Sequence, residues 1–318
     1  MSGSEPGGGE GTPRVMRSGS VALVGRPNAG KSTLMNRCLR EKLAITSDKP
    51  QTTRQRLIGI LSGDRGQMVF QDTPGIHRPK HRMNRQMVRY AIEALGDADV
   101  ICMMTDVHQQ FGSGEQYLLD LVAHAASPRV AVLNKVDLVS KPSLLPRMAR
   151  YSDSGVFEEI VPISALTGDG VDLLLDLLWG LLPEGKPIYD RELLTIHPER
   201  FLVAELIREK VLAATREELP FSTAVLLEHW EEPEGEDVER RPVRIFASVL
   251  VEKPGQKKIL VGSKGSMIKE IGTLARHDIE EFLARPVYLK LNVRHEPGWR
   301  ENQRLLAELE GQAASWGQ

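Results

Sequence analysis

The sequence has few cysteines, few aromatic residues and no long apolar run. Its two cysteines, Cys38 and Cys102, form no CxxC pair, which excludes the usual thiolate motif of a structural zinc site and a disulfide scaffold. No apolar stretch approaches the roughly 20 residues that a membrane-spanning helix needs. The Gly-rich residues 1–18 have no apolar core of signal-peptide length. We therefore expect a cytoplasmic protein that begins with a disordered tail, 1–18.

The sequence also has no large excess of either charge, because it contains 41 Lys and Arg and 43 Asp and Glu. The chain as a whole is therefore not a polycation. The charge is unevenly placed: residues 228–239 carry seven acids and no base, whereas residues 240–304 carry fourteen bases and seven acids. A basic segment of this kind is compatible with a polyanionic partner, although charge alone favours an ordinary solvated surface.

Short apolar runs alternate with amphipathic helical patterns as far as about residue 183. The expected strands are residues 20–25, 56–62, 67–72, 100–106, 129–135 and 159–164. The expected helices between them are Lys31–Arg40, Met83–Leu95, Glu115–Ala125 and Val171–Leu182. Such alternation predicts an α/β domain with a mostly parallel sheet over residues 19–183.

The pattern changes after a linker punctuated by proline and glycine, residues 184–197. A long helical pattern over residues 198–218, ended by Pro220, is followed by two β-rich stretches, two short helical pieces and a last strand. The β-rich stretches are residues 223–230, 243–252 and 287–293. The order α-β-β-α-α-β predicts a second, α+β domain over residues 198–300, with a tail over 301–318.

The stretch 25-GRPNAGKST-33 has the pattern of a P-loop, since it follows an expected strand and opens an expected helix. Glycines let backbone N–H groups surround a phosphate, and the helix N-terminus adds partial positive charge. Lys31 is expected to reach the β- and γ-phosphates, and Ser32 to bind Mg²⁺. The nucleotide-binding residues expected in this stretch are Gly25, Asn28, Ala29, Gly30, Lys31, Ser32 and Thr33.

Three further motifs, 72-DTPG-75, 134-NKVD-137 and 164-SAL-166, each end an expected strand. Asp72 is expected to hold Mg²⁺ and the Gly75 N–H to sense the γ-phosphate. The Asp137 carboxylate matches two N–H donors of guanine that adenine lacks, so the motif favours GTP and disfavours a metabolic kinase. The other expected base contacts are Asn134 bracing the base, Lys135 lying over it, the Ala165 N–H on guanine O6, and the neighbouring Ser164 and Leu166.

The segment 50-PQTTRQR-56 lies between the P-loop and DTPG. A threonine here would complete the Mg²⁺ shell when the γ-phosphate is present, which makes the segment a switch. Thr53 is preferred to Thr52 for this role. The expected catalytic residues are Lys31, Thr53, Asp72 and Gly75.

Ile76 follows DTPG, where many small GTPases place a glutamine that orients the attacking water. His77 is a weak substitute, so we expect slow intrinsic hydrolysis assisted by a metal ion or a partner. Asn28 resembles the P-loop asparagine of potassium-stimulated GTPases. That likeness implies a K⁺ ion near the phosphates, which would supply positive charge to the transition state.

The loop 262-GSKG-265 lies between two helical patterns, with a strand hairpin before it and a strand after it. This is the context of a KH domain, whose GxxG loop clamps a short run of nucleotides; the alternative is a helix-turn-helix in an ordinary core. Trp299, after the last strand, either stacks on a base or caps the core. The other expected RNA contacts are Lys257, Lys258, Gly262, Ser263, Lys264, Gly265 and Lys269.

Taken in order, GRPNAGKST, PQTTR, DTPG, NKVD, SAL and VGSKGSMIKEIG resemble the Era family of bacterial GTPases over about residues 21–299. The resemblance implies a Ras-like P-loop GTPase domain followed by a type II KH domain, and a monomer. It also implies binding to the 3′ end of small-subunit ribosomal RNA, a role in small-subunit assembly, and peripheral association with the inner membrane face. Two hypotheses stay open: a GTP-controlled RNA-binding switch, or an RNA-binding assembly factor whose GTPase only times release.

Overall fold

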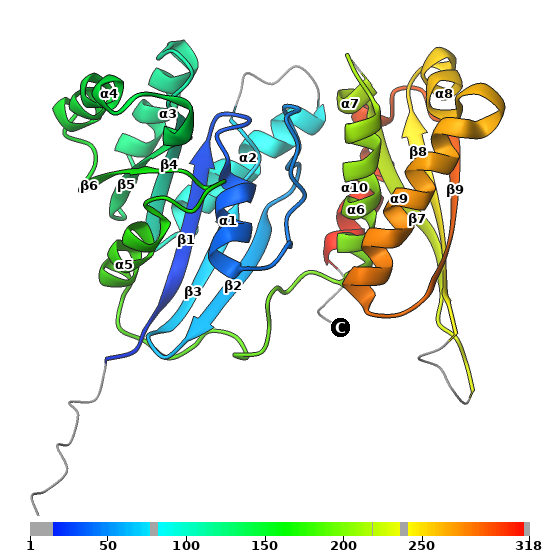
Figure 1. Ribbon diagram of the computed structural model, residues 1–318, viewed down its shortest axis with the longest axis horizontal. Helices are drawn as coiled ribbons and strands as arrows, with labels where there is room; N and C mark the ends of the chain where they lie inside the picture. The colour runs from blue at the N-terminus through cyan, green and yellow to red at the C-terminus, as the bar shows by residue number, and fades with distance from the viewer. Residues whose placement is uncertain (1–14, 77–81, 218, 236–240, 315–318) are drawn as a thin grey trace, which may run out of the picture.

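The computed structural model describes residues 15–76, 82–217, 219–235 and 241–314. The expected disordered tail falls largely on residues 1–14, and His77 is also outside the described residues. The chain forms two domains side by side, joined by an extended connection (Figure 1). Within the described ranges, no helix is both long and apolar enough to cross a membrane.

The N-terminal domain is built on a six-stranded sheet with the order β2-β3-β1-β4-β5-β6. Its strands are β1 (Arg17–Gly25), β2 (Leu57–Gly63), β3 (Gly66–Asp72), β4 (Val100–Asp106), β5 (Arg129–Asn134) and β6 (Glu159–Ile163). Only β2 runs antiparallel to its neighbour, which confirms the mostly parallel sheet. β1 starts at Arg17, inside the expected tail, because this stretch pairs with β3.

Helices cover both faces of this sheet. In β1, for example, the consecutive residues Val21–Val24 point alternately to the two faces, and all are apolar and buried. α1 (Lys31–Leu39) and α5 (Val171–Leu181) pack on one face with Leu23 of β1. α2 (Arg82–Asp97), α3 (Ser113–Ala123) and α4 (Lys141–Asp153) pack on the other with Ala22 and Val24.

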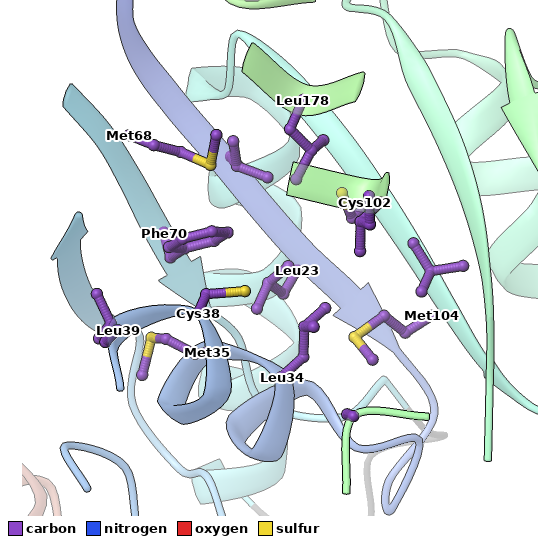
Figure 2. Packing of buried hydrophobic residues seen from close by; sticks show 14 of the residues in the cluster. Leu23, Leu34, Met35, Cys38, Leu39, Met68, Phe70, Cys102, Met104 and Leu178 are labelled. Carbon is purple, nitrogen blue, oxygen red and sulfur yellow. The ribbon is translucent and has the colours of Figure 1, made fainter. Parts of the chain in front are cut away.

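The two cysteines lie inside the first of these cores. Figure 2 shows Cys38 of α1 and Cys102 of β4 among Leu23, Met35 and Phe70. Burial, reinforced by the charge of Asp172, raises the pKa of the Cys38 thiol to about 12. Both residues therefore act as small apolar packing groups rather than as nucleophiles or metal ligands.

The C-terminal domain has a three-stranded sheet, β7-β8-β9, with β7 antiparallel and β9 parallel to β8. Its elements in chain order are α6 (Glu199–Ala214), α7 (Leu219–Ser222), β7 (Thr223–Glu231), β8 (Val243–Val251), α8 (Pro254–Val261), a 3-10 turn (Ser263–Gly265), α9 (Ser266–Leu283) and β9 (Val287–His295). This order confirms the expected α+β arrangement. The long helix ends earlier than expected, at Ala214, because Thr215 adopts an extended conformation, and Pro220 belongs to α7.

The stretch expected as a C-terminal tail is mostly helical and packed. A 3-10 turn (Trp299–Glu301) leads into α10 (Gln303–Ala314), whose Leu305 and Leu306 are buried. They join a cluster with Trp299 of the same domain and with Met83 and Met87 of α2. This cluster therefore crosses from one domain to the other, on the side where α6 and α10 face the N-terminal domain (Figure 1).

Candidate nucleotide and RNA sites

The P-loop connects β1 to α1 and is closely surrounded by backbone and side chains. Gly30 has a φ of 95°, and a Cβ there would collide with the amide group of Asn134. A Cβ on Gly25 would lie 2.5 Å from the carbonyl oxygen of Met104. Glycine is thus required at both positions, one for its left-handed backbone and one for close approach.

Lys31 is buried at the first turn of α1 and points back into the loop. Its Nζ lies 3.2 Å from the Arg26 carbonyl and 3.5 Å from the Gly25 carbonyl. Burial lowers the pKa of Lys31, while the charge of Asp72 opposes that shift. A cavity of about 280 Å³ adjoins the loop, large enough for a polyphosphate chain. Its lining includes Asn28, Gly30, Lys31, Ser32, Thr33, Thr53, Gly75 and Lys135.

Three oxygen-bearing side chains converge beside this cavity. The Ser32 hydroxyl donates to Asp72 Oδ2 over 2.6 Å, and Thr53 Oγ1 lies 3.0 Å from the Ser32 oxygen and 3.2 Å from Asp72 Oδ2. Asp72 is fully buried, and its Oδ1 has no hydrogen-bond partner within the described part of the chain. Burial raises the pKa of Asp72 despite the opposing effects of Lys31, Ser32 and Thr53. One carboxylate and two hydroxyls suit Mg²⁺, which keeps its remaining positions for phosphate and water.

The two threonines of PQTTR have different surroundings. Thr52 is buried and its hydroxyl donates to the Lys49 carbonyl over 2.7 Å, away from Asp72. Thr53 is the one that reaches the Ser32–Asp72 pair. Geometry agrees with the choice of Thr53, whose binding of Mg²⁺ stays a prediction.

The DTPG segment passes directly against the P-loop. A Cβ on Gly75 would lie 2.6 Å from the backbone nitrogen of Pro27, so only glycine fits there. The next residue, Ile76, donates its N–H to the Gly25 carbonyl over 3.1 Å and buries its side chain in the core. The position at which many small GTPases carry a water-orienting glutamine is therefore occupied by a packed aliphatic group.

Asn134, at the end of β5, bonds two neighbouring loops. Its amide nitrogen donates to the Ala29 carbonyl over 2.8 Å, and its oxygen accepts the Ala165 N–H over 2.9 Å. Asn134 thus ties the P-loop to the SAL loop. A side-chain amide has a second N–H and a second lone pair, so the expectations that Asn134 braces the base and that the Ala165 N–H contacts guanine O6 stay predictions.

The remaining base-site residues lie around the ends of β5 and β6. Lys135 has a φ of 69° and its Nζ pairs with Asp106 Oδ2 at 2.7 Å, which fixes its stem. Asp137 lies in a 3-10 turn (Val136–Leu138) and is exposed, as a carboxylate that reads a base must be. Ser164 is buried and its hydroxyl accepts the Thr167 N–H over 3.1 Å, whereas Leu166 is 68% exposed.

The second candidate site is the GSKG loop between α8 and α9. Gly262, Lys264 and Gly265 all have positive φ, at 72°, 50° and 81°. A Cβ on Gly262 would lie 2.8 Å from the Met267 nitrogen, whereas a Cβ on Gly265 would meet nothing within 4 Å. The loop is therefore tight on its inner side and open on its outer side. Five residues expected to contact RNA are exposed on the loop and the flanking helices: Lys257, Lys258, Ser263, Lys264 and Lys269.

Trp299 does not belong to this surface. Its side chain is 1% exposed, and its indole N–H donates to the Ser222 carbonyl over 2.9 Å. A base cannot stack on a ring that is fully buried and that already has the Arg54 guanidinium 5.8 Å from its centroid. The expected RNA role of Trp299 is thus wrong, and the alternative role of capping the core is the one observed.

Sequence reasoning also missed the residues of the C-terminal domain that reach the switch segment, 50–56, and the residues just before it. Arg208 of α6 donates to the Thr52 carbonyl, and Glu209 accepts the Thr46 N–H over 3.0 Å. The partners are more than 150 positions apart in the chain, so no local pattern could have signalled them.

Comparisons with known proteins agree on both domains. Residues 20–135 match the family model "50S ribosome-binding GTPase", and residues 218–300 match "KH domain". "GTPase Era" of Geobacter metallireducens is 47% identical over 92% of this chain and 97% of that protein. "GTPase Era" of Staphylococcus haemolyticus is 42% identical over 92% of this chain and 96% of its own length.

Two solved structures resemble the whole chain. An Era variant of Aquifex aeolicus bound to GDP and AlF4⁻ superposes with a TM-score of 0.87 at 36% identity, covering 94% of this chain and all of that one. Era in complex with MgGDPNP and nucleotides 1506–1542 of 16S ribosomal RNA gives a TM-score of 0.89 at 37% identity, covering 94% and 99%. Since relatives of this identity match nearly from end to end, the chain belongs to the Era family of GTPases.

Proposed function

We propose that this protein is a GTP-hydrolysing switch that binds small-subunit ribosomal RNA near its 3′ end and assists assembly of the small subunit. The observation that carries this function is the pairing, on one chain, of the Ser32–Thr53–Asp72 site with an open GSKG loop. The first suits a magnesium nucleotide, and the second suits a nucleic-acid backbone. A relative with the same two domains holds both MgGDPNP and a 16S ribosomal RNA segment.

The choice of 16S ribosomal RNA depends on the C-terminal domain. The family description that mentions the 50S subunit covers residues 20–135 only and says nothing about the half of the chain that carries GSKG. The RNA-bound relative matches this chain over 94% of its length, which is far more than the N-terminal domain alone. We therefore favour the small-subunit RNA.

Binding of a labelled 16S 3′-end oligonucleotide, with GDP and with a non-hydrolysable GTP analogue, tests this function. Gly265→Asp would place a negative group in the open space outside the loop, where phosphates are expected to lie. Gly298→Asp is a matched control, because Gly298 also has positive φ (67°) and open space around a Cβ. Loss of RNA binding in Gly265→Asp alone supports the RNA site.

The nucleotide dependence of the same titration separates the two hypotheses left open by the sequence. Tighter binding with the GTP analogue supports a coupled switch. Equal binding with both nucleotides supports an assembly factor whose GTPase times release. No binding in either state would contradict the RNA-binding function itself.

We also propose that hydrolysis is slow without help and is assisted by K⁺. Ile76 is packed into the core and offers no group to the attacking water. Asn28 has a φ of 64° and donates from its amide nitrogen to the Asp48 carbonyl over 2.6 Å, which leaves the amide oxygen as the group for a cation. Turnover in KCl should exceed turnover in NaCl, and Asn28→Ser should remove the difference. Equal turnover in the two salts would rule out the K⁺ site.

A further inference from the structure

The peptide that carries Thr53 is held by the C-terminal domain on both sides. Before it, Arg208 of α6 donates a guanidinium N–H to the Thr52 carbonyl. After it, Arg54 donates to the Thr223 carbonyl over 2.6 Å and to the Pro220 carbonyl over 3.0 Å. Thr53 is therefore placed between two anchors that both belong to the other domain.

The Arg208 anchor is buried and firmly oriented. Its side chain is 2% exposed, and Glu205, one turn earlier on α6, accepts from its Nε over 2.7 Å and from the same nitrogen that bonds Thr52. α6 itself is fixed in the C-terminal core through Val203 and Ile207, which are fully buried. A charged donor held in a dry interface keeps its acceptor in place more strongly than a surface pair does.

The same domain also contacts the residues before the switch segment and the end of that segment. Glu209, next to Arg208 on α6, accepts the Thr46 N–H over 3.0 Å and pairs with Lys42 at 2.7 Å. At the other end, Gln55 donates to the Leu309 carbonyl of α10 over 3.2 Å. These contacts thus reach from Lys42 to Gln55, and within the described residues Arg208 is the side chain that bonds the peptide group directly before Thr53.

We propose that Arg208 is a positioning residue of the nucleotide site, reaching it from the KH domain. By holding the Thr52 carbonyl, Arg208 fixes the rotation of the peptide that aims the Thr53 hydroxyl at Ser32 and Asp72. This inference rests on the proposed function as a GTP switch. Thr53 is expected to join the Mg²⁺ shell only when the γ-phosphate is present, so loss of Arg208 should weaken GTP binding and spare GDP binding.

Arg208→Gln in the full chain tests this role, with Arg200→Gln as its matched control. Arg200 lies on the same helix but is exposed and packs over the Trp230 ring, away from the switch segment. We expect the Kd of a non-hydrolysable GTP analogue to rise about tenfold in Arg208→Gln, as for a lost charged hydrogen bond, and the Kd of GDP to stay within about twofold. Arg200→Gln should leave both values unchanged. Equal losses for both nucleotides would reduce Arg208 to a general interface contact and overturn the proposal.

Amide hydrogen exchange gives a readout that needs no nucleotide. Peptides covering residues 49–56 should exchange faster in nucleotide-free Arg208→Gln than in the parent or in Arg200→Gln. If the parent failed to bind the GTP analogue, the proposed function would fail, while the exchange measurement would still decide whether Arg208 orders Thr53. Unchanged exchange in Arg208→Gln overturns the proposal.

A double-mutant cycle with Thr53→Val separates positioning from stability. If Arg208 acts through Thr53, then Arg208→Gln should cause no further loss of GTP-analogue affinity in the Thr53→Val background. Additive losses would show that Arg208 acts elsewhere. Should Arg208→Gln fail to fold, Arg208→Lys is the second variant, because it keeps a donor and a positive charge. We then expect an intermediate loss of affinity for the GTP analogue and none for GDP. Equal losses of affinity for both nucleotides in Arg208→Lys would contradict the role.

Discussion

Asp137 is the residue on which the choice of nucleotide depends. It is exposed in a turn at the end of β5, where its carboxylate can accept both N–H donors of a guanine edge. Asp137→Asn replaces one acceptor oxygen with a donor, which opposes a guanine N–H but suits the C2 carbonyl of xanthine. We expect GTP affinity to fall by about 100-fold or more and XTP binding to appear. Competition of GTP and XTP against a fluorescent nucleotide measures this, and unchanged GTP affinity would contradict it.

Trp299 contributes to stability rather than to RNA binding. Trp299→Phe keeps most of the buried ring area but removes the indole N–H that the Ser222 carbonyl accepts. We expect the free energy of unfolding to fall by about 1–3 kcal/mol, with RNA affinity unchanged. Thermal denaturation and the RNA titration measure the two effects. A loss of RNA affinity in a fully folded variant would restore the stacking role.

The predictability of single residues follows from how far their partners lie along the chain. Lys31, Ser32 and Asp72 were identified because each belongs to a short motif at a strand end, and the structure brings them together. Trp299 was left with two roles because the group that covers it, Ser222, lies 77 positions earlier. Arg208 gave no signal, since an arginine normally predicts a solvated position, whereas α6 is buried over most of its length.

Among the elements, α9 carries an ion cluster that joins it to the loop after α1. Asp278 of α9 lies 2.5 Å from Lys210 and 3.1 Å from Lys42 of the N-terminal domain. Burial opposes ionisation of Asp278, but hydrogen bonds from Lys210 and Lys42 outweigh it and hold its pKa below the ordinary value. The pKa of Lys42 is raised in turn: burial alone would lower it, but the contacts with Glu209 and Asp278 prevail.

These shifts predict a stabilisation that is constant across neutral pH. A depressed carboxylate pKa stabilises above the unfolded value, about 3.9, and that contribution is lost as the pH falls through the lower folded pKa. A raised lysine pKa stabilises below about 10.4 and is lost only at higher pH. Asp278→Asn should therefore lower the melting temperature by about 1–3 °C equally at pH 5 and pH 9, and the difference should shrink and vanish as the pH falls through the lowered pKa of Asp278.

Asp64→Asn is the control for this measurement, because Asp64 is exposed in the β2–β3 turn. Its melting temperature should match that of the parent at every pH. A difference between Asp278→Asn and the parent that changed between pH 5 and pH 9 would point to another titrating group in the contact.

The helices and strands that can be predicted from the sequence are those with a clear local pattern of apolar residues. The strands of the parallel sheet were found because continuous apolar runs bounded by turns mark them. α4 is not among the expected helices; it contains Pro142, which sits in its tolerant first turn, and Pro146, which a helix interior normally disfavours. The sequence predicts a tail where α10 lies, because the burial of Leu305 and Leu306 depends on a surface shared by two domains.

At the scale of the whole molecule, the C-terminal domain faces the nucleotide site on one side and carries the GSKG loop on the opposite side. α6 faces the N-terminal domain and bonds the peptide before Thr53, whereas α8 lies on the far side (Figure 1). α9 starts directly after the GSKG loop and packs against α6 in the same core. A movement of the loop on RNA binding can therefore reach the switch segment through two packed helices rather than through the linker, residues 184–197.

This arrangement predicts reciprocal coupling that depends on Arg208. By linkage, the factor by which a GTP analogue tightens RNA binding must equal the factor by which RNA tightens GTP-analogue binding. In Arg208→Gln both factors should shrink together toward one, while RNA affinity with GDP stays as in the parent, because GSKG is intact. Titrating RNA at saturating nucleotide, and nucleotide at saturating RNA, measures both sides. If the factor persisted unchanged in Arg208→Gln, the coupling would have to pass through another contact between the domains, such as the one where Met83 and Met87 of α2 pack against Trp299.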